Sequence, residues 1–203
     1  MGVLIPAVGL GLGGCAELQA LKPFFLPVEA PEATAWDRHR ASVGSVRAWT
    51  LQGRVAVETA DDGWNATMTW EQRADHYALR LMAPLSQGTF ELEGDTGGVT
   101  LRTAENETLT ATDPEALMRD HLGWSLPVGG LKFWIRGIPD PDRPHTDLKL
   151  DESGRMTDLI QDGWRVSVLR YQKVGDKDLP DKLFLQNDPV KVRVVIGQWQ
   201  PQS

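Results

Sequence analysis

Apolar and polar residues alternate over most of the chain after residue 48. This period of two is typical of strands that bury one face and expose the other. The first group of alternating segments comprises residues 49–57, 64–70, 77–81, 90–92, 99–101 and the residues around Leu109. Turn-forming residues separate them, as in Asp61-Asp62-Gly63. The pattern therefore predicts six strands joined in succession.

Three segments instead carry helical signals. Thr34 and Asp37 have the spacing of a capping box, and an apolar stripe follows that contains Trp36, Val43 and Val46. Asp113-Pro114 places a cap before a proline at the first helical position, and Gly123 ends that helix. A third short helix is predicted over residues 128–136. Residues 139–144 contain three prolines and are interpreted as a loop.

Strand patterning resumes after that loop. Further strands are predicted within residues 147–150, 156–160, 166–170, 182–185 and 190–199. About eleven antiparallel strands with two or three inserted helices indicate a mainly β fold. Such a set favours a strongly curved or incompletely closed barrel with helices over its open face.

The amino-terminal segment differs from the rest of the chain. Residues 3–14 are uncharged and mostly apolar, but they are too few to cross a bilayer as a helix, which needs about 20 residues. They are typical of the apolar region of a secretory signal peptide. The segment ends in Leu12-Gly13-Gly14-Cys15, which resembles the bacterial lipobox. No Lys or Arg precedes the apolar stretch, which leaves the true start of the chain open.

This segment predicts the domain organisation. Residues 1–14 are interpreted as a lipoprotein signal peptide, and Cys15 as the residue that receives the lipid and begins the mature chain. The alternative is a buried cysteine in an apolar strand. Residues 15–33, with prolines at 23, 27 and 31, are interpreted as a tether. Residues 34–203 then form one β-rich domain.

Composition and motifs argue against several classes of function. A net charge of -7 opposes binding to nucleic acid, and a single cysteine cannot form an internal disulfide. The four histidines lie in separate segments, without close metal-binding spacing. Residues 9–14 match G-x-G-x-x-G, but no strand precedes them and no βαβ unit follows. We therefore expect no catalytic activity, no metal and no cofactor.

Several segments together resemble the LolB family of outer-membrane lipoprotein receptors. Besides the lipobox and the tether, they are residues 49–57, 69–72, 81–85 and 131–139. Their order and spacing carry the resemblance, which extends over about residues 34–199.

The resemblance implies a half-barrel of eleven antiparallel strands with a helical lid over an apolar cavity. It also implies a monomeric receptor at the periplasmic face of the outer membrane. The receptor takes triacylated lipoproteins from the periplasmic carrier LolA and inserts them into that membrane. The residue matching the family's membrane-inserting leucine is Leu85. Ala16 follows Cys15, and the absence of aspartate there is consistent with sorting to the outer membrane.

The apolar positions of the pattern supply candidate lining residues for the cavity. They are Trp49, Leu51, Val55, Met68, Trp70, Tyr77, Leu79, Leu81, Phe90, Leu92, Leu101, Leu117, Leu131, Trp134 and Val168. Membership of an ordinary core is the alternative for each.

Two other functions compete with the receptor. The first is an envelope assembly lipoprotein that docks a protein partner without binding lipid. A filled core would favour it, whereas a concave apolar interior with room for acyl chains favours the receptor. The second is a soluble carrier similar to LolA, against which the lipobox argues.

Overall fold

The computed structural model describes residues 2, 34–84 and 88–202. Residues Ala33–Ser203 form one compact unit. The predicted signal peptide, apart from Gly2, and the predicted tether lie outside the described residues. The division of the chain at residues 14 and 33 therefore stays a prediction.

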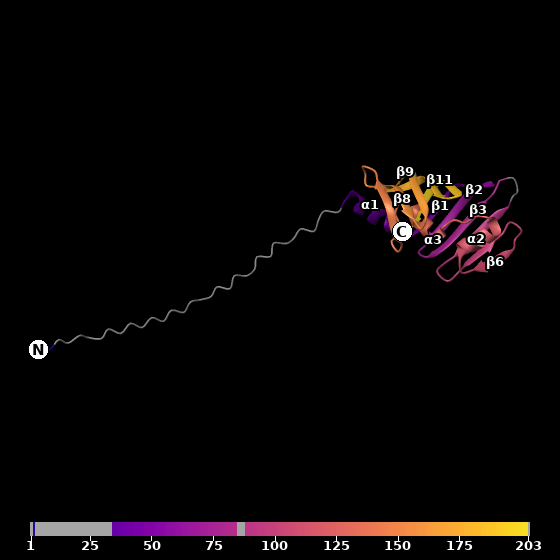
Figure 1. Cartoon of the computed structure of the whole chain (residues 1–203), viewed down its shortest axis with the longest axis horizontal. Helices are drawn as coiled ribbons and strands as arrows, with labels where there is room; N and C mark the ends of the chain where they lie inside the picture. Colours follow the sequence, from indigo (N-terminus) through magenta and orange to yellow (C-terminus); the bar gives the residue numbers. More distant parts are fainter. Residues whose placement is uncertain (1, 3–33, 85–87, 203) are drawn as a thin grey trace. The chain divides into compact units, whose positions relative to one another are not determined.

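Eleven strands and three helices make up the described part of this unit (Figure 1). The helices are α1 (Ala35–Gly44), α2 (Pro114–Leu122) and α3 (Val128–Trp134). The strands are β1 (Ala48–Glu58), β2 (Gly63–Arg73), β3 (His76–Met82), β4 (Thr89–Gly94), β5 (Val99–Arg102), β6 (Thr108–Ala111), β7 (His145–Leu150), β8 (Met156–Gln161), β9 (Trp164–Val174), β10 (Lys177–Asn187) and β11 (Val190–Gln202).

The strands form a single antiparallel sheet in the order β6-β5-β4-β3-β2-β1-β11-β10-β9-β8-β7. The first and last strands of the set, β1 and β11, pair in the middle, while β6 and β7 are the two edges. The pairing shifts register at Gln52/Gly53 and again around Pro180 and Lys182. Such bulges bend strands and increase their twist, which lets an open sheet curve around helices. The predicted mainly β fold with an open sheet is confirmed.

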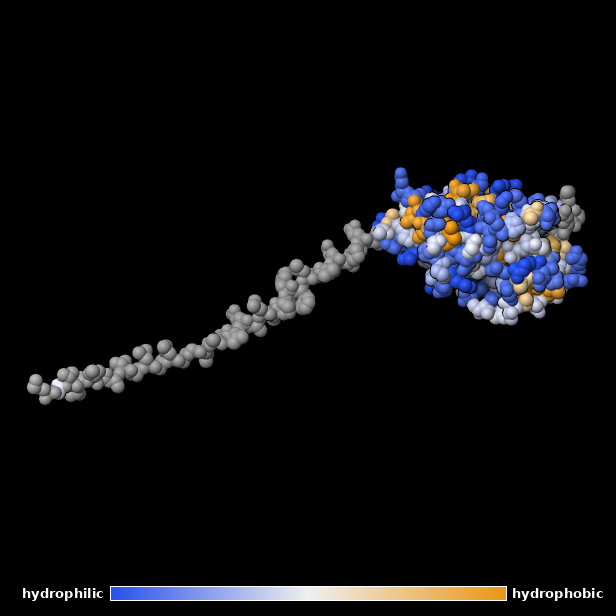
Figure 2. Space-filling view, in the orientation of Figure 1, coloured by the Kyte–Doolittle hydropathy of each residue, from blue (hydrophilic) through white to orange (hydrophobic). Residues whose placement is uncertain are grey.

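Burial alternates along the strands as the sequence pattern predicts. We call the face with the buried side chains the inner face, and the opposite one the outer face. On β1, Leu51 and Val55 are buried while Arg54 and Ala56 are exposed. The helix α2 lies beside β5 and β6 (Figure 1). Hydrophilic residues cover most of the visible face of this unit, with small apolar patches between them (Figure 2).

The helix signals are largely confirmed, with one error. Thr34 Oγ1 accepts from the N–H of Asp37 at 3.1 Å, and Asp37 Oδ2 accepts from the N–H of Thr34 at 3.2 Å, which is the predicted capping box. Asp113 caps α2, and Gly123 ends it with a φ of 76°. Val46 does not extend the stripe of α1, because that helix ends at Gly44. Val46 is nevertheless buried, in the connection to β1.

The hairpin of β9 and β10 is longer than its apolar pattern predicts. The pattern indicates residues 166–170 and 182–185, whereas the strands extend over Trp164–Val174 and Lys177–Asn187. The extra residues near the turn pair through charge, as Lys173 Nζ lies 3.0 Å from Asp178 Oδ2. Leu179 is buried in this part of β10, but the register shift around Pro180 and Lys182 interrupts the alternation that would have indicated the longer strand.

Candidate functional site

The inner face of the sheet and the helices share one apolar cluster. Fourteen of the fifteen predicted lining residues are buried in it, and Phe90 packs against it partly buried. They come from β1 to β5, β9, α2 and α3, segments far apart in the sequence. The structure therefore brings the predicted set together. Whether these side chains contact acyl chains stays a prediction.

Sequence reasoning missed most of the other half of this interior. The residues that it left out are on β8 to β11, and they are Met156, Leu159, Trp164, Val166, Leu179, Leu183, Leu185, Val192, Val194, Ile196 and Trp199. The alternation of Val192, Val194 and Ile196 was a usable signal, because it places all three on one face of a predicted strand.

Tryptophan rings pack together where β1, β2 and β11 adjoin. The ring of Trp49 lies 5.2 Å from that of Trp70 and 5.2 Å from that of Trp199, measured between centroids. Trp199 Nε1 donates to the carbonyl oxygen of Pro180 at 2.8 Å, and Trp70 Nε1 donates to Gln72 Oε1 at 3.1 Å. These buried donors are satisfied, so the rings present apolar surface to the interior without an unpaired polar group.

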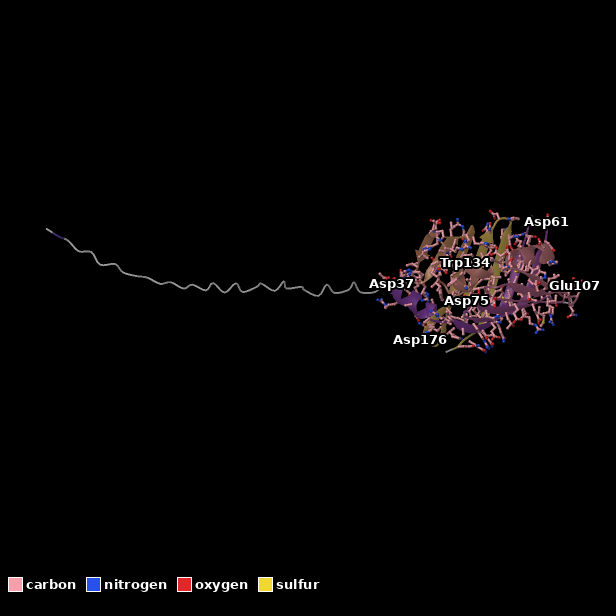
Figure 3. All side chains as sticks on the ribbon, turned by 90° about the horizontal axis from the view of Figure 1, so that it is seen from below. Asp37, Asp61, Asp75, Glu107, Trp134 and Asp176 are labelled. Atoms are coloured by element: carbon pink, nitrogen blue, oxygen red, sulfur yellow. The ribbon has the colours of Figure 1, made fainter. Side chains whose placement is uncertain are left out.

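Trp134 joins α3 to the strand β8 on the other side of the interior. Its Nε1 donates to Gln161 Oε1 at 2.7 Å. Gln161 Nε2 donates in turn to the carbonyl oxygens of Asp140 and Arg143, each at 2.9 Å. Trp134 has no exposed surface, and it lies in the middle of the domain (Figure 3). Gln161 is 1% exposed, so this amide organises both α3 and the loop that follows it.

Arg136 holds the end of the same segment near the start of β1. Its Nη1 donates to the carbonyl oxygen of Val46 at 2.8 Å, and its Nε donates to the carbonyl oxygen of Lys132 at 3.0 Å. Burial lowers the pKa of Arg136 to about 10, so the guanidinium stays charged near neutral pH. Lys132 Nζ also lies 3.4 Å from Asp75 Oδ1 in the turn between β2 and β3. Polar contacts thus fasten α3 to the sheet at both of its sides.

Around its largest side chains the interior is filled in this conformation. A water-sized sphere does not reach Met68, Trp70 or Trp134, which are 0% exposed. An internal void as large as a water molecule beside these side chains would appear as exposed surface. Acyl chains thus have no room beside them until side chains or helices move. Taken alone, a filled core agrees with the docking alternative.

The predicted site residues Leu85 and Cys15 lie outside the described residues. The described residues on either side of Leu85 in the sequence are Pro84 and Gly88. The N–H of Ala83 donates to the carbonyl oxygen of Gly88 at 3.1 Å, so these two residues lie side by side. Gly88 has a φ of 95°, which favours glycine. A side chain there would also clash with Ala104. The roles of Leu85 and Cys15 stay predictions.

Within the described ranges, we found no group of three or more His, Cys, Asp or Glu side chains arranged to hold a metal ion. No described helix has the length and apolarity to cross a membrane.

Comparison with known proteins gives one consistent family. Residues 47–199 match the family model described as outer membrane lipoprotein LolB. The chain is 36% identical over 189 residues to the outer-membrane lipoprotein LolB of Nitrosococcus oceani, covering 93% of this chain and 92% of that one. It is 40% identical over 168 residues to the LolB of Pseudomonas putida F1, covering 83% and 82%.

A solved structure has the same fold at low sequence identity. A LolA superfamily protein from Nitrosomonas europaea aligns with a TM-score of 0.53 and 4% identity, over 84% of this chain and 95% of that one. At this identity the likeness concerns the fold alone.

Proposed function

Because the chain belongs to the LolB family of outer-membrane lipoproteins, we propose that its apolar interior accepts the acyl chains of lipoproteins delivered by a LolA-type carrier. The chain is an outer-membrane lipoprotein receptor that acts in lipoprotein localisation. The observation that carries the proposal is the continuous apolar inner face, with α2 and α3 packed on it. The docking alternative is not favoured, because this family's proteins are receptors.

The size of the hydrophobic effect explains why such a receptor is needed. Three acyl chains of about fifteen methylenes each, at ~0.8 kcal/mol per methylene, cost on the order of 30 kcal/mol in water. Free diffusion of the acylated cargo is therefore excluded. A protein interior that replaces water around the chains removes most of this cost.

Cargo entry requires the filled interior to open, and α3 is the element that we expect to move. It has seven residues and is fastened by a few polar contacts, whereas the strands are paired along their lengths. Exposing the ring of Trp134 alone costs about 4–6 kcal/mol, from 150–250 Å² at ~25 cal/mol per Å². The burial of the acyl chains relative to water is several times larger than this cost, so an opened, loaded receptor is still far more favourable than cargo exposed to water.

The remaining parts of the proposal concern the membrane. We propose that Cys15 carries the lipid anchor, that the chain acts as a monomer, and that Leu85 enters the bilayer when cargo is released. The hydrogen bond between Ala83 and Gly88 supports the last point, because it places two described residues that flank Leu85 in the sequence side by side at the end of β3.

Photo-crosslinking from two leucines tests the acyl-binding interior. A photo-reactive amino acid replaces Leu131, which is 1% exposed on α3, and in a second protein it replaces Leu169, which is 57% exposed on β9. Each protein is mixed with a LolA-type carrier loaded with a radiolabelled triacylated lipoprotein. We expect labelled adducts at position 131 and none at position 169.

The capture of cargo by the unsubstituted chain is measured in parallel. Capture without crosslinking at position 131 would place the acyl chains elsewhere. Failure of capture from a carrier that is active with another acceptor would contradict the receptor proposal itself.

A further inference from the structure

Two arginines lie close together on the outer face of the sheet, away from the apolar interior. Arg54 is on β1 and Arg193 is on β11, and both are exposed. Arg54 pairs with Val195, and Ala56 pairs with Arg193. The two arginines are therefore diagonal neighbours on one face, with backbones about 7–8 Å apart. Long side chains at that spacing reach a common group.

The arginines line an outer-face pocket of about 320 Å³. The rest of its lining consists of apolar or uncharged residues, namely Val55, Ala56, Asn65, Ala66, Thr67, Met82, Ala83, Pro84 and Val195. The pocket thus has two guanidinium groups, an amide and a hydroxyl above an apolar floor. None of its lining residues carries a carboxylate.

In the described part of the chain, two other cations on the outer face are paired with carboxylates, whereas Arg54 and Arg193 are not. Lys191 Nζ lies 3.0 Å from Glu58 Oε1, and Arg170 Nε lies 2.7 Å from Asp181 Oδ2. Within the described residues, no ion pair joins Arg54 or Arg193 to an acidic side chain. In a chain with a net charge of -7, two adjacent unpaired arginines are a local excess of positive charge. Their mutual repulsion favours an anion between them.

The chemistry of the pocket selects a phosphate group. The planar fork of a guanidinium matches phosphate oxygens in bidentate geometry, and an amide and a hydroxyl offer further donors. We propose that the outer-face pocket binds phosphate groups of membrane phospholipids and orients the receptor on the bilayer. This inference rests on the proposed function, which places the chain at a membrane during cargo release.

Two features favour a membrane as the source of the phosphate. Met82 lines the same pocket and is 48% exposed, so the pocket also presents an apolar side chain to the outside. The pocket also ends at Ala83 and Pro84, the residues directly before the segment that contains Leu85. A bilayer supplies phosphate at its surface and an apolar layer beneath it. A free phosphate ion would match the arginines alone.

Vesicle binding tests the proposal. The protein used is the chain from residue 15 to residue 203 with Cys15→Ser, so that no acyl anchor contributes. Its partition is measured by co-sedimentation with vesicles of phosphatidylcholine, and with vesicles in which about one third of the lipid is phosphatidylglycerol. Arg54→Gln combined with Arg193→Gln should lower the partition onto the anionic vesicles by about 30-fold at low salt.

A charge-matched control separates the pocket from net charge. Arg73→Gln combined with Lys173→Gln also removes two positive charges. Both residues lie toward the opposite end of the sheet, and Arg73 pairs with Ala48, six residues or about 20 Å along β1 from Arg54. That separation exceeds the Debye length of about 10 Å. The control should therefore change the partition by less than about threefold.

The outcomes distinguish this inference from the receptor function. Normal capture of cargo from the carrier, with vesicle binding lost only in the Arg54 and Arg193 variant, supports the inference. Equal effects of the two double variants, or no effect of the first, overturn it and leave the receptor proposal standing. Failure of the unsubstituted chain to capture cargo overturns the receptor proposal instead. Circular dichroism of every variant confirms that the fold is retained.

Discussion

Two adjacent glycines in α3 are expected to respond in opposite ways to the same substitution. A methyl group on Gly130 would lie 2.7 Å from Cζ2 and 3.0 Å from Cη2 of the Trp134 ring. A methyl group on Gly129 would meet nothing within 4 Å. Neither glycine has a positive φ, so alanine fits the backbone at both positions. Gly130 is buried against the ring, whereas Gly129 is exposed.

The expected magnitudes follow from two opposing effects. Alanine stabilises a helix relative to glycine by up to about 1 kcal/mol, and by about 0.5–1 kcal/mol in a first turn such as this one. Over-packing a filled core costs about 1–3 kcal/mol, and Trp134 has no space into which it can retreat. We therefore expect Gly129→Ala to raise the free energy of unfolding by about 0.5–1 kcal/mol, and Gly130→Ala to lower it by about 1–2 kcal/mol.

Urea unfolding followed by far-ultraviolet circular dichroism measures the difference. With a slope of about 2 kcal/mol per molar urea, the two midpoints should lie roughly 1 M apart. Equal stabilisation by both substitutions would show that Trp134 moves without cost. That result would refute the conclusion that the interior is tightly filled around the ring of Trp134.

Three further predictions address the core, the pH response and the membrane. Gln161→Leu leaves Trp134 Nε1 and two loop carbonyls without partners, so it should lower the free energy of unfolding by about 3 kcal/mol in the same urea assay. The control Gln186→Leu, at a partly exposed position, should change that free energy by under about 0.5 kcal/mol. Burial lowers the pKa of His39, so below pH 6.5 the unfolded chain binds a proton more readily than the folded chain does. Thermal stability should therefore fall as the pH drops below 6.5. His39→Gln should make stability less dependent on pH in this range, and an unchanged pH dependence would assign the effect to other groups. Leu85→Glu should leave cargo capture intact and abolish transfer to liposomes, and unchanged transfer would remove its proposed role.

The apolar pattern predicted the strands best where one face is buried and the other is polar. Trp49 to Val57 is such a case, and its alternation matches the burial on β1. The pattern failed near the turn between β9 and β10, where the pairing shifts register around Pro180 and Lys182 and so interrupts the period of two. The alternation along one strand does not show which residues of another strand pair with it, so the hydrophobic period alone does not reveal such pairs or shifts in their register.

The sequence predicted which residues make up the candidate site, but not how tightly they pack. Alternation identified the residues that face inward, because burial on one face is what creates the period of two. It did not reveal Gln161, a buried polar residue on the inner face. The side chain of Gln161 stabilises the domain by hydrogen bonds to Trp134 and to the loop after α3. Nor did it reveal that the interior is filled, since packing between α3 and the sheet depends on distances that no pattern encodes.

A filled interior also bears on the direction of cargo transfer. Acyl chains lose about the same contact with water in a protein interior as in a bilayer, so the large hydrophobic term nearly cancels between the two. If cargo enters by the proposed opening of α3, the smaller energy regained when α3 and Trp134 repack after the cargo leaves favours release, and about 5 kcal/mol lowers the net affinity roughly 10³–10⁴-fold. Gln161→Leu weakens that closure, because Trp134 loses its hydrogen bond. The variant should therefore hold captured lipoprotein longer and transfer it to liposomes more slowly, whereas faster transfer would contradict a role for closure in release.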